Sequence, residues 1–89
     1  MALRKAFGKG AISAKEKEWA DKARRFIKAE LKRADVTYAE LARRLREHGL
    51  EDETEGSVTA KLARGTFSVT FFLAVLTVLG IEAVTLAAL

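Results

Sequence analysis

Helix-start signals recur along this sequence of 89 residues, and they constrain its fold more than any other feature. Ser13 with Glu16, and Thr37 with Glu40, have the spacing of a capping box, in which a hydroxyl and a carboxyl bind free backbone N–H groups of the first helical turn. Ser68 is a third N-cap residue. The chain contains no proline, so caps and glycines must set the boundaries of its elements. These signals predict an all-α protein.

Apolar residues follow the first two caps at the three- and four-residue spacing of one helix face. The first series predicts an amphipathic helix of about twenty residues that begins after Ser13. Its predicted core-facing residues are Trp19, Ala23, Phe26, Ile27, Leu31 and Ala34. The second predicted helix begins near Tyr38 and ends at Gly49. Leu41 and Leu45 form its apolar side.

Two further apolar series predict the rest of the bundle. Val58 and Leu62, four residues apart, predict a short third helix that ends at Gly65. The uncharged stretch 67–79 predicts a fourth helix. Residues 81–89 are apolar and are predicted either as a short fifth helix or as an extended segment, because β-branched residues within them weaken a helix.

The domain organisation follows from the chain's small size of 9.8 kDa, which allows one hydrophobic core. Residues 1–12 have no sustained apolar period and are predicted to be a flexible basic arm. Residues 13–89 are therefore predicted to form a single helical domain.

The composition argues against catalysis. The chain has no cysteine, which excludes disulfides, cysteine zinc sites and a cysteine nucleophile, and is typical of a protein of the cytoplasm. His48 is the only histidine, and no carboxylate stands at a catalytic spacing from it. We therefore expect no enzymatic activity, no metal and no cofactor.

Charge is sorted along the chain. Residues 1–33 hold eleven lysines and arginines against four acidic residues, whereas residues 66–89 hold Glu82 as their single charge. A basic first third favours a polyanionic partner, because summed positive charge attracts phosphate backbones. The alternative is a solvated helix face with no partner. A helix over the uncharged residues 66–81 would be about 24 Å long, shorter than a hydrocarbon core of about 30 Å, so we expect no membrane partner.

Three segments stand in the order of a known DNA-binding domain. They are TYAELARRL from Thr37, the pair Val58 and Leu62 before the ARG of residues 63–65, and FSVTFFLAVLTVLGI from Phe67. Over residues 24–86 the chain resembles the Cro and phage-repressor type of helix-turn-helix domain. It is most similar to a small bacterial family of unknown function with a WADKARRF start and an ARGTF step. The resemblance implies a λ-repressor-like bundle of four to five helices and a small bacterial DNA-binding transcription regulator.

The turn between the second and third helices departs from this family. From Ala42 to Val58 the chain has about six residues more than the usual pattern. The extra segment contains four acidic residues: Glu51, Asp52, Glu53 and Glu55. Like charges of this kind repel a phosphate backbone, so the enlarged turn is predicted to point away from DNA, or the surface serves another partner.

The resemblance also implies a set of DNA contacts on the second and third helices. They are Thr37 and Tyr38 as phosphate contacts, Ser57, Thr59 and Lys61 as groove contacts, Arg64 as a backbone contact, and Arg43 with Arg44 as weaker candidates. For Ser57, Thr59 and Lys61 to act in this way, they must project outward from a helix seated by Val58 and Leu62. In the alternative interpretation the hydroxyls only cap helices and the cations are solvated.

A protein–protein interaction module on a helix-turn-helix scaffold is the alternative function, because a fold does not determine a function. The acidic turn and the apolar surplus of the last third favour it. Under either function a homodimer through the fourth helix and the C-terminal tail is expected, since one domain reads only a short stretch of double-stranded DNA.

Overall fold

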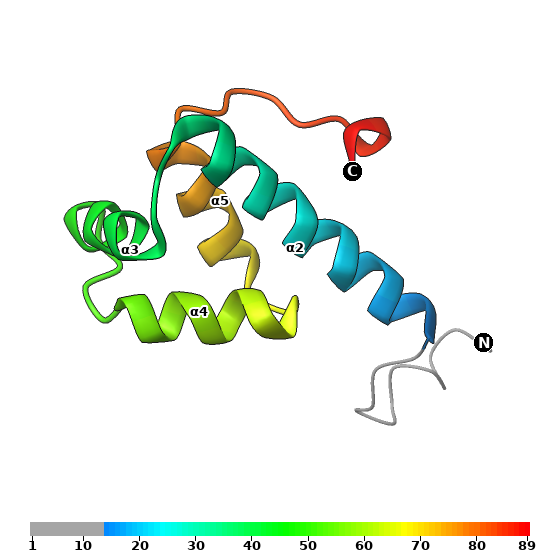
Figure 1. Ribbon diagram of the computed structural model, residues 1–89, viewed down its shortest axis with the longest axis horizontal. Helices are drawn as coiled ribbons and strands as arrows, with labels where there is room; N and C mark the ends of the chain where they lie inside the picture. The colour runs from blue at the N-terminus through cyan, green and yellow to red at the C-terminus, as the bar shows by residue number, and fades with distance from the viewer. Residues whose placement is uncertain (1–13) are drawn as a thin grey trace.

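Four α-helices and a single 3-10 turn make up the computed structural model, which describes residues 14–89 and contains no strand in that range (Figure 1). The elements are α2 (Ala14–Ala34), α3 (Tyr38–Glu47), α4 (Glu55–Arg64), α5 (Val69–Val78) and η1 (Leu86–Ala88). The predicted all-α class and the order of four helices are confirmed. The predicted arm of residues 1–12 and the Ser13 cap lie outside the described residues.

The start of α3 follows the local sequence signal. The Thr37 hydroxyl accepts a hydrogen bond of 3.1 Å from the backbone N–H of Glu40, so Thr37 is the N-cap. Val36 and Leu41 are both buried and bracket the cap, as in a hydrophobic staple. The Glu40 carboxylate binds two arginines of its own helix, so only the hydroxyl half of the predicted capping box forms.

The start of α4 lies three residues before its first buried residue, Val58. Thr54 and Ser57 form a reciprocal capping box: the Ser57 N–H donates to the Thr54 hydroxyl at 3.1 Å, and the Thr54 N–H donates to the Ser57 hydroxyl at 2.8 Å. This cap was not predicted, because the usual partner at the third helical position is Glu or Gln. The helix ends at Gly65, which adopts a left-handed conformation with φ of 74°.

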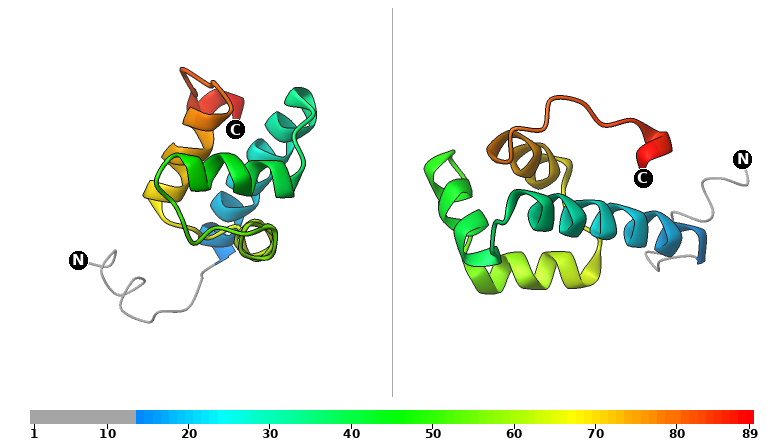
Figure 2. Two further views of the ribbon diagram at one scale, coloured as in Figure 1. Left: turned by 90° about the vertical axis from the view of Figure 1, so that its left-hand side faces the viewer. Right: turned by 45° about the horizontal axis from the view of Figure 1, so that its top comes forward.

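The core lies where the four helices meet. Its most deeply buried side chains are Ile27, Leu31, Leu41, Ala42, Leu45, Val58, Leu62, Phe71 and Val75. Helix α3 packs against α4 and α5, and α2 crosses α4 (Figures 1 and 2). At this crossing a Cβ atom on Gly65 would lie 2.8 Å from the backbone oxygen of Ala20, so the absence of a side chain permits the close approach of the two chains.

Trp19 is not a core residue, contrary to prediction. Its side chain is 57% exposed, and the Lys22 ammonium lies 4.7 Å from the centre of its ring. The predicted Ile27 and Leu31 are buried, and Ala20 joins them on the buried side of α2. Ala34, at the end of the helix, is exposed and was also predicted wrongly. Trp19 lies about 100° around the helix from Ala20 and therefore faces solvent.

The C-terminal tail is neither a helix nor an extended segment over its whole length, although these were the two predicted forms. Residues 81–85 form no regular element, and the single 3-10 turn of η1 follows them. The tail runs back beside α2 (Figures 1 and 2). It leaves the outer face of α5 without cover at Val69 and Leu73, which are 72% and 55% exposed.

Candidate nucleic-acid interface

Helix α4 presents a face of small side chains to solvent. Val58 and Leu62 are fully buried and seat the helix on the bundle, as predicted. The exposed positions opposite them are Gly56, Thr59, Ala60 and Ala63. No long side chain projects from these four positions, and small residues allow a helix to approach another surface closely.

The enlarged turn of residues 48–54 is fastened to α4 by a buried carboxylate. Glu53 is 6% exposed, accepts a hydrogen bond of 2.7 Å from the Ser57 hydroxyl and forms an ion pair with the Lys61 ammonium. We name these three residues the Glu53 clasp. Arg46 adds a hydrogen bond of 2.9 Å to the backbone oxygen of Glu53. One of the four acidic residues of the extra segment is therefore neutralised inside the fold, and it cannot repel a phosphate as an exposed carboxylate would.

The Glu53 clasp changes the expected orientation of two predicted groove contacts. Ser57 and Lys61 are partly buried and turn toward Glu53, whereas they were expected to project outward with Thr59. The Lys61 ammonium also lies 4.8 Å from the centre of the Phe71 ring, which holds it against the core. Thr59 does lie on the exposed face, and its hydroxyl donates to the backbone oxygen of Glu55 at 2.8 Å.

The predicted contacts on α3 have mixed surroundings. Arg43 is exposed but binds two carboxylates, with hydrogen bonds of 2.6 and 2.9 Å to Glu40 and 2.7 Å to Glu47. The hydrogen bonds from Arg43, and then the one from Arg44, lower the pKa of Glu40 from 4.5 to about 2. The same hydrogen bonds to Glu40 raise the pKa of Arg43. The arginine charge on this face is therefore largely compensated.

Thr37 and Tyr38 lie at the first turn of α3. The Thr37 hydroxyl is exposed and accepts the capping hydrogen bond, and its own proton remains available to a phosphate oxygen. Tyr38 is partly buried against the edge of the core.

A cluster of cations surrounds the C-terminal end of α4. Lys17 and Arg24 from α2 and Arg64 from α4 line a pocket of about 580 Å³, which also contains Asp21. We name these three cations the basic junction. Arg24 donates to the backbone oxygen of Ala63 at 3.2 Å and pairs with Asp21 at 2.7 Å. Arg64 is exposed and has no ion pair among residues 14–89.

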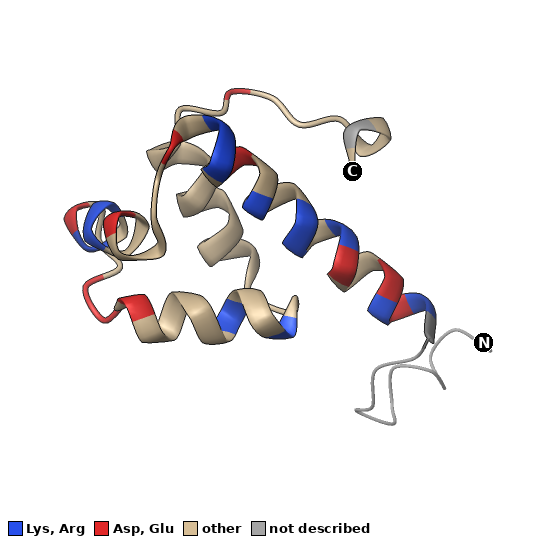
Figure 3. Cartoon of the chain, viewed as in Figure 1, with Lys and Arg blue, Asp and Glu red and all other residues tan. Residues whose placement is uncertain are grey.

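Charge therefore differs between the two ends of α4 (Figure 3). Acidic residues lie at its N-terminal end and basic residues at its C-terminal end. Lys17 and Arg24 were not among the predicted contacts. Their seven-residue separation places them on one side of α2, but only the crossing of α2 and α4 brings that side to Arg64.

The described residues offer little for other chemistries. No group of three metal-ligating side chains occurs among residues 14–89. In the same range no single helix is both long and apolar enough to cross a membrane, and α4 with α5 meet the length and composition test only as a pair, across a bend of 118°.

One comparison with known proteins identifies a family. The model of a domain of unknown function, DUF6471, matches residues 19–84. The chain belongs to this family. The DUF6471 match runs from Trp19 through all of α3, α4 and α5. It therefore contains the Glu53 clasp, the Gly65–Ala20 approach and the Arg24–Ala63 hydrogen bond. It agrees with the predicted resemblance to a family of unknown function. No curated protein and no solved structure matches the chain significantly.

Proposed function

We propose that this DUF6471 domain is a small DNA-binding regulator in which α3 and α4 form a modified helix-turn-helix within a λ-repressor-like bundle. The observation that carries the proposal is the uncovered small-residue face of α4 beside the basic junction. An exposed helix can enter the major groove while adjacent cations bind the phosphates on either side.

The division of charge along α4 determines how the helix meets DNA in this proposal. The C-terminal half approaches the duplex, because Arg64 and Lys17 attract phosphates whereas the acidic N-terminal end is repelled by them. Thr59 reads base edges, and the free proton of the Thr37 hydroxyl binds a phosphate oxygen. Tyr38 supports this contact from the edge of the core.

The remaining predicted contacts have supporting roles in this proposal. Ser57 and Lys61 hold the enlarged turn through Glu53, and Arg43 stabilises α3 through its two carboxylates. Their polar groups already have partners inside the protein, so each would have to give up an ion pair or a hydrogen bond to reach DNA.

A homodimer through α5 and the tail completes the proposal. Helix α5 contains no charged residue, and Val69 and Leu73 are exposed on its outer side. Two copies would place two α4 helices on one duplex in the cytoplasm. The same apolar face also favours the second candidate function, a protein–protein interaction module that does not bind DNA.

Fluorescence anisotropy with duplex DNA over a salt series tests the proposal. The logarithm of the association constant should fall linearly with the logarithm of salt concentration, with a slope of about −0.9 per phosphate contact. Arg64→Ala and Lys17→Ala should each reduce the magnitude of this slope by about 0.9. Lys32→Ala removes the same charge from an exposed position about 22 Å farther along α2 than Lys17 and is the matched control.

Two results would contradict DNA binding through this face. One is the absence of binding at low salt, which would favour the protein-interaction module. The other is an equal loss of slope for Lys32→Ala and Arg64→Ala, which would indicate general attraction by the basic chain and not contact by the basic junction.

A further inference from the structure

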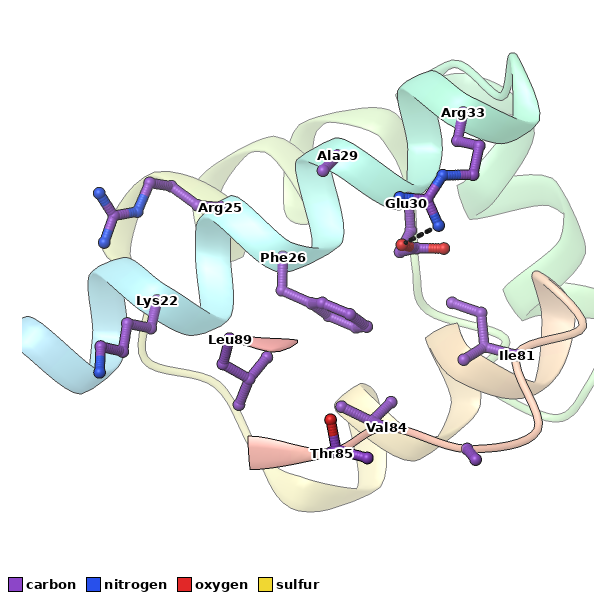
Figure 4. Close-up of a pocket in the computed structure, with 11 residues that line it drawn as sticks. Lys22, Arg25, Phe26, Ala29, Glu30, Arg33, Ile81, Val84, Thr85 and Leu89 are labelled. Atoms are coloured by element: carbon purple, nitrogen blue, oxygen red, sulfur yellow. Dashed lines mark ion pairs between the residues drawn. The ribbon is translucent and has the colours of Figure 1, made fainter. Parts of the chain in front are cut away.

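A second pocket lies on the side of α2 turned away from α4. It has a volume of about 620 Å³ and is formed between α2 and the C-terminal tail (Figure 4). Phe26 enters it from α2, and Ile81, Val84 and Leu89 face Phe26 from the tail. The volume falls within the range of about 300–1,000 Å³ that is usual for small-molecule sites.

Cations line the edge of this pocket. At one end of the pocket, Arg33 is paired with Glu30 at 2.8 Å, so its charge is compensated. Lys22 and Arg25 have no carboxylate partner among residues 14–89. They stand one helical turn apart at the opposite end. In Figure 4 Lys22 lies beside Leu89, whereas the Arg25 side chain points away from the pocket.

We propose that this pocket binds a soluble carboxylate that carries a single alkyl chain of about six to ten carbons. The alkyl chain lies between Phe26 and Val84, where burial removes its methylene groups from water. The carboxylate binds the Lys22 ammonium, and Arg25 reaches it by a change of side-chain rotamer. Charge complementarity determines this choice of ligand, because the side chains that carry an unpaired charge at the pocket edge are cationic, whereas Phe26 and Val84 between α2 and the tail are apolar. The inference rests on this pocket alone and does not depend on DNA binding.

Trp19 provides an internal reporter for the ligand. It is the only tryptophan of the chain, and the Lys22 ammonium lies over its ring. A carboxylate that draws Lys22 toward the pocket changes the charge next to the indole, so Trp19 fluorescence should change on titration.

Titration with hexanoate, octanoate and decanoate tests the apolar floor, with calorimetry as an independent readout. Affinity should rise about two- to fourfold per added methylene, because each buried methylene contributes up to about 0.8 kcal/mol. Decyltrimethylammonium, which has the same chain and the opposite charge, should not bind. Equal binding of the cation would overturn the proposal.

Paired substitutions test the location of the site. Ala29→Phe places a ring at the pocket lining and should abolish decanoate binding, whereas Ala39→Phe makes the same change at an exposed position of α3 and should leave it intact. Lys22→Gln should weaken binding about tenfold, and Lys28→Gln, at an exposed position outside the lining, should not. Circular dichroism establishes that each variant is folded.

Two outcomes would refute the site. Unchanged calorimetric affinity of folded Ala29→Phe for decanoate would place binding elsewhere. Binding to phosphatidylglycerol vesicles without any binding of soluble decanoate would indicate a membrane-surface partner in place of a small molecule.

Discussion

The cations of α3 and α4 differ from those of α2 in what surrounds them. Arg43 and Arg44 share the carboxylate of Glu40, and Lys61 is paired with Glu53. Along α2, Lys22 and Arg25 have no ion pair in the described part of the chain. Helices α3 and α4, which we propose as the helix-turn-helix, therefore use most of their positive charge internally. The charge that is free to attract an anion lies mainly on α2 and at Arg64.

Burial separates the ion pairs of α3 from the Glu53 clasp. The Arg43 pairs are exposed, and pairs of that kind contribute little because water and salt screen them. Glu53 is buried and Lys61 is partly buried against Phe71, so loss of either partner leaves a charge that water cannot fully solvate. We therefore expect substitutions in the Glu53 clasp to act on stability, and substitutions of free cations to act on binding.

The largest predicted effect is that of Glu53→Ala. This change leaves Lys61 unpaired against Phe71 and removes the acceptor of the Ser57 hydroxyl, so the free energy of unfolding should fall by about 3 kcal/mol. Urea denaturation followed by circular dichroism measures it. Glu51→Ala removes an exposed carboxylate of the same turn and should change stability by less than about 0.5 kcal/mol. An equal loss of unfolding free energy in the two variants would mean that the buried ion pair contributes no more to stability than an exposed carboxylate.

The next effect concerns the crossing where the cations of α2 meet α4. Gly65→Ala should destabilise the protein by about 2 kcal/mol or more, because its left-handed conformation strains an L residue and the new Cβ meets the backbone oxygen of Ala20. Gly80→Ala has the same φ of 74° but open space around it, and should cost only about 1 kcal/mol. Comparing the thermal unfolding of the two variants separates the cost of backbone strain from the cost of the steric contact. Equal unfolding temperatures would show that the close α2–α4 approach adds nothing to the destabilisation.

Much of the helical framework could be predicted because its signals are local. The cap at Thr37 and the stop at Gly65 each depend on residues within one or two turns. The Thr54 cap was missed because Ser57 replaces the usual longer acceptor, although a hydroxyl at that position could have indicated it.

The candidate site could be predicted only in part, because its charges are arranged by tertiary packing. Glu53 has the same sequence character as Glu51 and Asp52, and only the fold reveals that it is the buried one. Likewise, nothing local distinguishes Lys61, which turns inward, from Arg64, which stays free. Contacts formed by the fold determine which cation remains free to bind a partner. The charge pattern along one helix does not predict those contacts.

The smallest predicted effect is the pH dependence of the exposed α3 pairs. The pKa of Glu40 is lowered from 4.5 to about 2 in the folded protein, so its ionised form is favoured by folding. Its contribution to stability is therefore fully present above pH 4.5 and is lost as the pH falls toward 2. Glu40→Gln should flatten the pH dependence of the free energy of unfolding within this window.

Urea denaturation at a series of pH values, with Glu51→Gln as the control, measures this dependence. Repeating the series in 1 M salt sharpens the contrast between exposed and buried pairs. The Debye length is then about 3 Å, so the Glu40 contribution should shrink while the loss caused by Glu53→Ala should persist. If high salt diminished both effects to the same extent, the Glu53 pair would be screened like a surface pair. The distinction between Lys61 as a structural cation and the cations Lys17 and Arg64, unpaired among the described residues, as proposed binding cations would then have to rest on geometry alone, without the difference in burial.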